Sequence, residues 1–99
     1  MRYLRVKWKH SFSDEPVWLY TELDDNRCEV RKVEAYSDGR QDFASESESS
    51  GDTRLSLEPI PPLGEIASDP QFEPVEISAG EFERVWAEAH GGTKASNDL

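Results

Sequence analysis

The sequence has few of the residues on which disulfides, metal sites and nucleophilic catalysis depend. Its 99 residues include one cysteine, Cys28, and two histidines. A single cysteine excludes an internal disulfide framework and a cysteine-rich zinc site. The apolar runs are only a few residues long, which excludes a membrane-spanning helix. No basic start followed by an apolar run marks a secretion signal, so we expect a cytoplasmic protein.

Negative charge, in contrast, is in excess. The chain has 21 Asp and Glu against 11 Lys and Arg, a formal net charge of −10 at pH 7. Residues 1–41 are close to neutral, so the excess lies in residues 42–99. An acidic surface repels nucleic-acid phosphates and anionic lipids, and we therefore expect neither nucleic acid nor a membrane as a partner. A basic protein is the natural complement.

A chain of this length forms one domain, because cores divide only at about 250–300 residues. We expect residues 1–90 to fold together and residues 91–99 to form a disordered tail. Residues 46–53, Glu-Ser-Glu-Ser-Ser-Gly-Asp-Thr, contain no large apolar group that could offset the entropy of ordering them. This segment is predicted to be a mobile acidic loop.

Alternating apolar and polar residues predict an antiparallel meander in the first half of the chain. Such a period of two is typical of half-buried strands. The predicted strands are residues 2–10, 17–23, 28–36 and 40–45. In the third strand the apolar positions change parity between Val30 and Val33, which predicts a β-bulge near Arg31 and Lys32.

One clear helix is predicted near the C-terminus, over residues 79–90. Ser78 precedes Glu81 by three residues, the spacing of a capping box. Phe82 and Trp86 fall on one side of the helix, within an apolar stripe. We expect this helix to cover the apolar face of the meander, which carries residues such as Leu4.

The proline-rich connection holds weaker signals. Alternation at Leu55 and Leu57 predicts a short edge strand, and residues 63–67 are predicted to form a single helical turn. Two further prolines keep residues 70–77 extended. The elements together give an α+β fold, an antiparallel meander sheet of four or five strands packed against one C-terminal helix.

Three stretches of sequence resemble a known family. Residues 17–27 read Val-Trp-Leu-Tyr-Thr-Glu-Leu-Asp-Asp-Asn-Arg, residues 29–34 Glu-Val-Arg-Lys-Val-Glu, and residues 81–86 Glu-Phe-Glu-Arg-Val-Trp. They are similar to small bacterial domains of unknown function that share this Glu-Leu-Asp–turn–Arg-Lys-Val-Glu hairpin and a Glu-Phe-Glu-x-x-Trp helix. The resemblance implies a free-standing bacterial domain and supplies no catalytic residue.

The candidates for a catalytic site are His10 and Cys28. Imidazole is the commonest general acid–base group, and a Cys28 thiolate beside it would be a nucleophile. The sequence shows neither an oxyanion hole nor a third group to orient the pair. We therefore predict no catalytic residue and interpret both side chains as structural, while keeping them as candidates for an alternative site.

A polar cluster follows the second predicted strand, where Glu22, Asp24 and Asp25 precede Arg27. Carboxylates bind Mg²⁺ and Ca²⁺, but this spacing lacks the alternation and the glycine of a calcium loop. We predict no metal and no cofactor. The carboxylates either cap backbone amides and pair with arginines, or recognise a partner.

Two aromatic residues, Trp18 and Tyr20, lie on the strand face opposite Leu19. If both faces of the strand are covered, they are packing residues. If their face is open, they form a binding hot spot beside Glu22, because Trp, Tyr and Arg dominate interface energies.

The sequence therefore favours a non-enzymatic interaction module that binds a basic protein through its acidic surface. The most concrete version is an immunity protein or antitoxin that masks a basic toxin. The predicted contact residues are Trp18, Tyr20, Glu22, Asp24, Asp25 and Arg27. The alternative is a small-molecule-binding domain or small enzyme with a site between sheet and helix. The protein is expected to be a monomer, or a weak homodimer formed through an edge strand.

Overall fold

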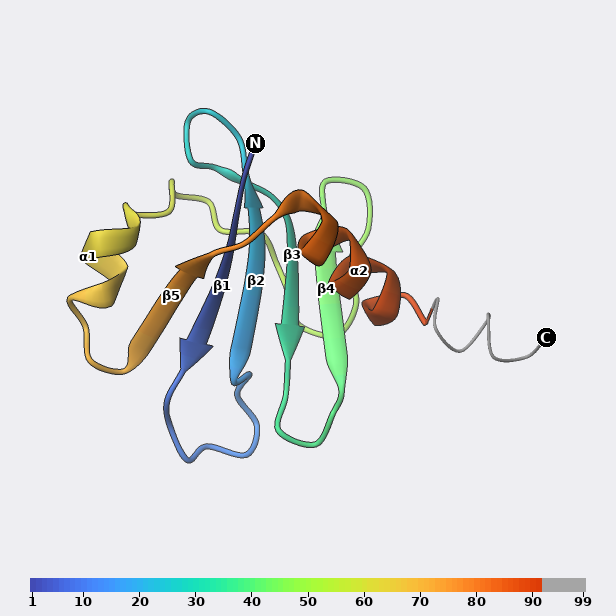
Figure 1. Ribbon diagram of the computed structural model, residues 1–99. Coiled ribbons are helices and arrows are strands. Elements are labelled where there is room, and N and C mark those ends of the chain that lie inside the picture. The colour runs from blue at the N-terminus through green and yellow to red at the C-terminus, as the bar shows by residue number, and fades with distance from the viewer. Residues whose placement is uncertain (92–99) are drawn as a thin grey trace.

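The computed structural model describes residues 1–91, so the predicted tail beyond Gly91 lies outside the described residues. Five antiparallel strands form one sheet in the order β4-β3-β2-β1-β5 (Figure 1). The elements are β1 (Arg2–Trp8), β2 (Trp18–Leu23), β3 (Glu29–Ala35), β4 (Gln41–Ser45), α1 (Leu63–Ala67), β5 (Phe72–Glu76) and α2 (Ala79–Ala89). The α+β class, the four-stranded meander and the C-terminal helix are confirmed. Neither described helix is long and apolar enough to cross a membrane.

The fifth strand does not come from the predicted segment. Leu55 and Leu57 lie in an irregular connection, and Leu57 is 99% exposed. The fifth strand is instead β5, which pairs with β1 and includes Pro74. Proline has no N–H for a ladder, so an edge strand is the place in a sheet where it is tolerated. The single helical turn predicted over residues 63–67 is confirmed as α1.

The β-bulge is present, one residue before the predicted position. Glu22 pairs with Arg31 and Leu23 pairs with Glu29, so Val30 is the extra residue of β3. A bulge reverses the facing of the residues that precede it. Glu29 consequently lies on the side of the sheet opposite to Arg31.

Helix α2 covers the face opposite to the one expected. Directly paired residues share a face, and α2 lies on the side of Tyr3 and Phe43, here called the helix face. The Phe82 ring centroid is 5.5 Å from that of Tyr3, and the Trp86 centroid is 5.6 Å from that of Phe43. The expectation failed because alternation alone favours the more aliphatic face as the covered one. The other face carries aromatic rings and long cationic side chains, and the aromatic stripe of α2 packs against these.

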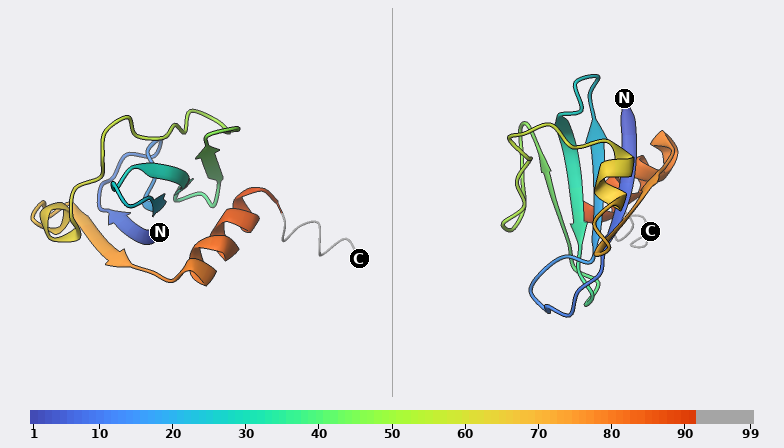
Figure 2. Two further views of the ribbon diagram at one scale, coloured as in Figure 1. Left: turned by 90° about the horizontal axis from the view of Figure 1, so that it is seen from above. Right: turned by 90° about the vertical axis from the view of Figure 1, so that its left-hand side faces the viewer.

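The face of Leu4 and Val6, here called the cleft face, is covered by the irregular segment that follows β4. Viewed from above, this segment and α2 lie on opposite sides of the sheet (Figure 2). Thr53, 1% exposed, donates its hydroxyl to a Glu34 carboxylate oxygen at 2.7 Å and fixes the segment to β3. The sheet is therefore covered on both sides.

The acidic segment 46–53 turns back along β4. The Ser50 N–H donates to the Phe43 carbonyl at 2.8 Å, and Ser49 forms an isolated bridge with Ala44. These bonds give the segment a defined course. The mobility predicted for it stays a prediction.

Helix α2 begins at the predicted cap. The Ser78 hydroxyl accepts the Glu81 N–H at 3.1 Å, and the helix ends at Ala89, followed by the cap residue His90 and by Gly91, whose φ of 78° is left-handed. The Glu81 carboxylate does not return to the cap as it would in a full capping box. Its Oε2 lies 3.1 Å from Arg5 Nη1, so it ties the first turn of α2 to β1.

The core contact of α2 is Phe82, which is 0% exposed. Replacing it in Phe82→Ala should lower the free energy of unfolding by about 3–5 kcal/mol, because the ring leaves a cavity between helix and sheet. Urea denaturation followed by far-UV circular dichroism measures this. The matched control Leu57→Ala removes an exposed side chain and should change stability by less than about 0.5 kcal/mol. Equal losses in the two variants would contradict the packing described.

Candidate functional site

Glu22, a predicted contact residue, is held inside the fold. It is 7% exposed, and Arg31 Nε and Nη2 donate to its two carboxylate oxygens at 2.5 and 3.1 Å. The same guanidinium reaches Glu83 of α2, with Nη2 to Oε2 at 2.5 Å. These hydrogen bonds lower the pKa of both carboxyls and raise the pKa of Arg31. In this arrangement the Glu22 carboxylate joins the sheet to the helix through Arg31, and a contact role for it stays a prediction.

Trp18 and Tyr20 lie on the same face and are half-buried. The Trp18 ring lies under two cations, with its centroid 5.5 Å from Arg5 Cζ and 5.8 Å from Lys7 Nζ. Burial raises the pKa of the Tyr20 hydroxyl. Both aromatics thus have packing partners within the domain, and a contact role for them stays a prediction.

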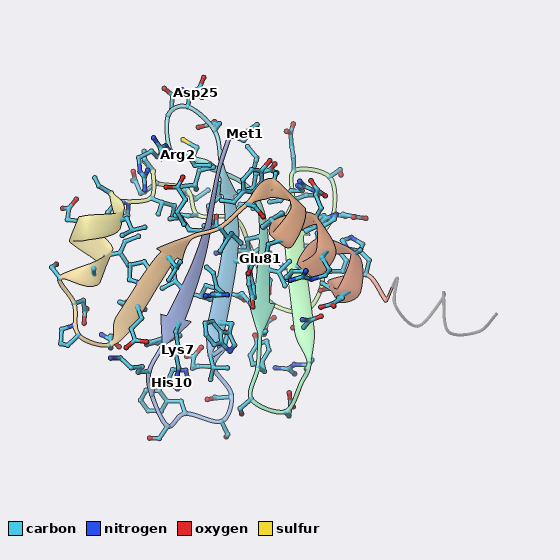
Figure 3. The ribbon with its side chains drawn as sticks, viewed as in Figure 1. Met1, Arg2, Lys7, His10, Asp25 and Glu81 are labelled. Carbon is cyan, nitrogen blue, oxygen red and sulfur yellow. The ribbon has the colours of Figure 1, made fainter. Side chains whose placement is uncertain are left out.

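The β2–β3 turn, residues 24–28, is organised by Asp24. Its Oδ1 accepts the N–H groups of Asn26 and Cys28, each at 2.9 Å. This is the amide-capping role that such a turn favours. Asp25 beside it is exposed at the tip of the turn (Figure 3).

Arg27 clamps the proline-rich segment to this turn. Its φ of 63° lies in the left-handed region, uncommon for a residue with a side chain. From there Nε and Nη2 donate to the carbonyls of Ile60 and Pro61 at 2.8 and 2.7 Å. The Ile60 N–H returns a bond to the Arg27 carbonyl at 2.8 Å. The guanidinium therefore positions the chain that follows rather than pairing with the nearby carboxylates.

The segment held by Arg27 forms the outer wall of an open cleft on the cleft face, with a volume of about 350 Å³. Leu4, Val6 and Leu19 form its apolar floor, and Ile66 of α1 lies on its outer side. Sequence reasoning missed this site. The available signal was the presence of isolated isoleucines among the prolines and acids of residues 58–70.

Carboxylates line the cleft, and no Lys or Arg does. The Glu29 side chain is 5% exposed, and its carboxylate is engaged: it accepts hydrogen bonds from the Thr21 hydroxyl at 3.0 Å and the Ser56 N–H at 2.7 Å, and it lies 3.2 Å from Lys32 Nζ. Glu65 on α1 is exposed, and within residues 1–91 no ion pair or hydrogen bond engages its carboxylate. The uncompensated charge at the cleft rim is therefore negative.

The two catalytic candidates do not meet. His10 lies in the β1–β2 connection, where Nδ1 accepts the Phe12 N–H at 2.9 Å and Nε2 is 2.8 Å from the Pro16 carbonyl oxygen. Cys28 lies in the β2–β3 turn, at the other end of the sheet; His10 and Asp25 mark the two ends in Figure 3. Both ring nitrogens of His10 are thus occupied by the backbone. Among the described residues, no group of three His, Cys, Asp or Glu side chains could hold a metal ion.

Charge divides between the sheet and the loops. Most basic residues of the sheet and its margins are ion-paired within the domain: Arg2, Arg5, Lys9, Arg31, Lys32 and Arg40. In the described part of the chain, the carboxylates outside any ion pair include Asp14, Glu15, Asp25, Asp38, Glu46, Asp52, Glu58 and Glu65. The excess negative charge is consequently displayed by the loops and by α1.

The lowered pKa of Glu22 and Glu83 makes the stability of the fold sensitive to acid. The unfolded chain binds protons more readily at these groups, so the stability they contribute is complete above the ordinary glutamate pKa and is lost as the pH falls through their lowered values. Glu22→Gln should lose about 1.5–3 kcal/mol at neutral pH, the range for hydrogen bonds to charged groups. Its free energy of unfolding should also fall less steeply in acid.

Urea titrations at a series of pH values measure both effects. Glu46→Gln, on the exposed loop, is the control and should stay within about 0.5 kcal/mol of the wild type at neutral pH. An acid dependence in Glu22→Gln as steep as in the wild type would show that the Arg31 pair does not control it.

The comparisons with known proteins give a family. The family described as "Domain of unknown function (DUF6881)" matches residues 2–91. No curated protein and no solved structure matches the chain. The matched range runs from the first residue of β1 to the left-handed glycine after α2, and so includes the whole sheet, both helices and the cleft. The chain therefore belongs to this family of domains of unknown function.

Proposed function

We propose that this domain is a non-enzymatic interaction module that binds a basic protein partner. The observation that carries the proposal is the division of charge. Most cationic side chains of the sheet are engaged in internal ion pairs, whereas most loop carboxylates are outside any ion pair in the described residues. A domain that displays charge of one sign attracts a partner of the opposite sign and accelerates their encounter.

The most concrete version is an immunity protein or antitoxin that covers a basic toxin. Its mechanism would be steric: the domain occupies a surface that the toxin needs, and charge complementarity speeds and orients the association. Asp25 and Glu46 support this version, because both are exposed and follow the C-terminal ends of β2 and β4, which lie at the same end of the antiparallel sheet. Such a mechanism requires no catalytic group.

The test compares two double variants of equal net charge in capture from native cell lysate. Asp25→Asn with Asp52→Asn neutralises carboxylates that lack ion pairs. Glu73→Gln with Glu76→Gln neutralises two that already pair with Lys9 and Arg2, and serves as the control. We expect the wild type and the control to retain one stoichiometric basic protein at low salt and to release it at high salt.

The first variant should retain several-fold less of this protein. Mass spectrometry identifies and quantifies what is captured. Retention of no basic protein at low salt would contradict the proposal, as would equal retention by the two variants. Capture that persists at high salt would contradict the claim that charge attraction contributes to binding.

A second candidate function, a small-molecule-binding domain, is favoured by the cleft of about 350 Å³, which lies between the sheet and α1. Sites for small ligands begin at about this size and are similarly apolar. Native mass spectrometry of the purified full chain tests it. An additional mass that is present in the wild type and lost in Ile66→Trp would support this function, whereas a bare wild-type mass would count against it.

A further inference from the structure

We propose that the cleft receives an apolar side chain of the basic partner, from a segment in which Lys or Arg flanks that side chain. This inference rests on the proposed function and states where the partner makes its central contact. It places that contact on the cleft face, away from the Trp18 and Tyr20 side of the sheet. Its support comes from the shape of the cleft, its charge and the way its wall is held.

The shape suits an apolar anchor. Leu4 and Val6 are buried by the surrounding fold, yet they line an open cavity together with Leu19 and Ile66. About 350 Å³ is enough for one large apolar side chain, and burying such a side chain contributes about 1.5–3 kcal/mol. Anchors that fill pockets of this kind typically dominate the energy of an interface.

The negative charge at the rim of the cleft favours Lys or Arg on either side of the partner's apolar side chain. No cation lines the cleft, and the exposed Glu65 carboxylate at its rim is engaged by no ion pair or hydrogen bond within residues 1–91. Asp69 adds a second negative charge at the same rim. An apolar ligand with a carboxylate, such as a fatty acid, would be repelled here. A peptide segment with flanking Lys or Arg places cations against Glu65 and Asp69, next to a low-dielectric wall that strengthens the attraction.

The wall of the cleft is held in place before any partner arrives. Arg27 fixes the carbonyls of Ile60 and Pro61, and the Glu29 carboxylate fixes the Ser56 N–H. A preformed site avoids the entropy cost of ordering a loop on binding. The Arg27 clamp also joins this wall to the turn that displays Asp25.

Three capped pentapeptides test the inference on the full, ¹⁵N-labelled chain. The probes are Lys-Arg-Leu-Arg-Lys, Lys-Arg-Ser-Arg-Lys and Glu-Asp-Leu-Asp-Glu. Amide chemical shifts locate the binding, and titration gives the Kd. We expect the basic leucine peptide to shift the amides of Leu4, Val6, Thr21 and Ile66. The serine peptide should affect only the acidic loops, and the acidic leucine peptide should bind most weakly.

Two pairs of variants provide matched controls. Ile66→Ala removes an apolar wall residue, and Leu57→Ala removes an exposed one from the same covering segment. Glu65→Lys reverses a charge at the rim, and Glu46→Lys reverses one on the distant loop. We expect each cleft variant to raise the Kd of the basic leucine peptide at least about fivefold, and each control to change it less than about twofold. Amide spectra with native dispersion verify that every variant is folded.

The outcomes separate this inference from the proposed function. If both basic peptides shift only the loop amides, and with equal Kd, the cleft inference is overturned while the recognition of basic partners stands. If neither basic peptide binds at any site, both fail. Binding of the acidic leucine peptide in the cleft as tightly as the basic one would overturn the charge selectivity, and with it the inference.

Discussion

One guanidinium, that of Arg31, joins the two layers on which the fold depends. It donates to both carboxylate oxygens of Glu22 within the sheet and to Glu83 on α2. Its Cζ also lies 5.0 Å from the ring centroids of Phe82 and Trp86. A cation in this position is stabilised by hydrogen bonds and by aromatic faces at once. It explains how a helix with an aromatic stripe packs on a sheet face that also carries charge.

Because α2 covers the helix face, the proposed partner is left with the loops, α1 and the cleft face. Internal ion pairs engage most cations of the sheet, and many carboxylates outside any ion pair in residues 1–91 lie on the loops and on α1. Within residues 1–91 no helix as long as α2 lies over the cleft face, which is covered by an irregular segment pinned by Arg27 and Thr53. An open apolar cleft with an acidic rim follows from this covering, and it directs the proposed partner to that side of the sheet.

Local signals in the sequence predicted the local structure. Alternation located four strands, Ser78 located the start of α2, and residues 63–67 were correctly predicted as one helical turn. The errors concern contacts between distant segments. Alternation does not tell which face a remote helix will cover, so α2 was expected over Leu4 rather than over Tyr3. The fifth strand was also placed wrongly, because pairing with β1 outweighs the poor strand propensity of Pro74.

The sequence offered the side-chain roles at the β2–β3 turn, but it did not reveal the cleft. Asp24 caps backbone amides and Glu22 pairs with an arginine. Both contacts agree with the first of the two interpretations given for these carboxylates, and the second, recognition of a partner, stays a prediction. The cleft was missed because its floor and its wall lie some 40 to 60 positions apart in the sequence and are brought together by long-range contacts such as the Arg27 clamp and the Glu29–Ser56 hydrogen bond.

The claim that Arg31 fastens α2 to the sheet is tested most directly by native-state hydrogen exchange of Arg31→Met. The account predicts that the exchange free energies of amides in α2 fall further than those of amides in β1 and β2, because the helix loses its link while the central strands keep their ladder. Equal changes in α2 and in the central strands would contradict it.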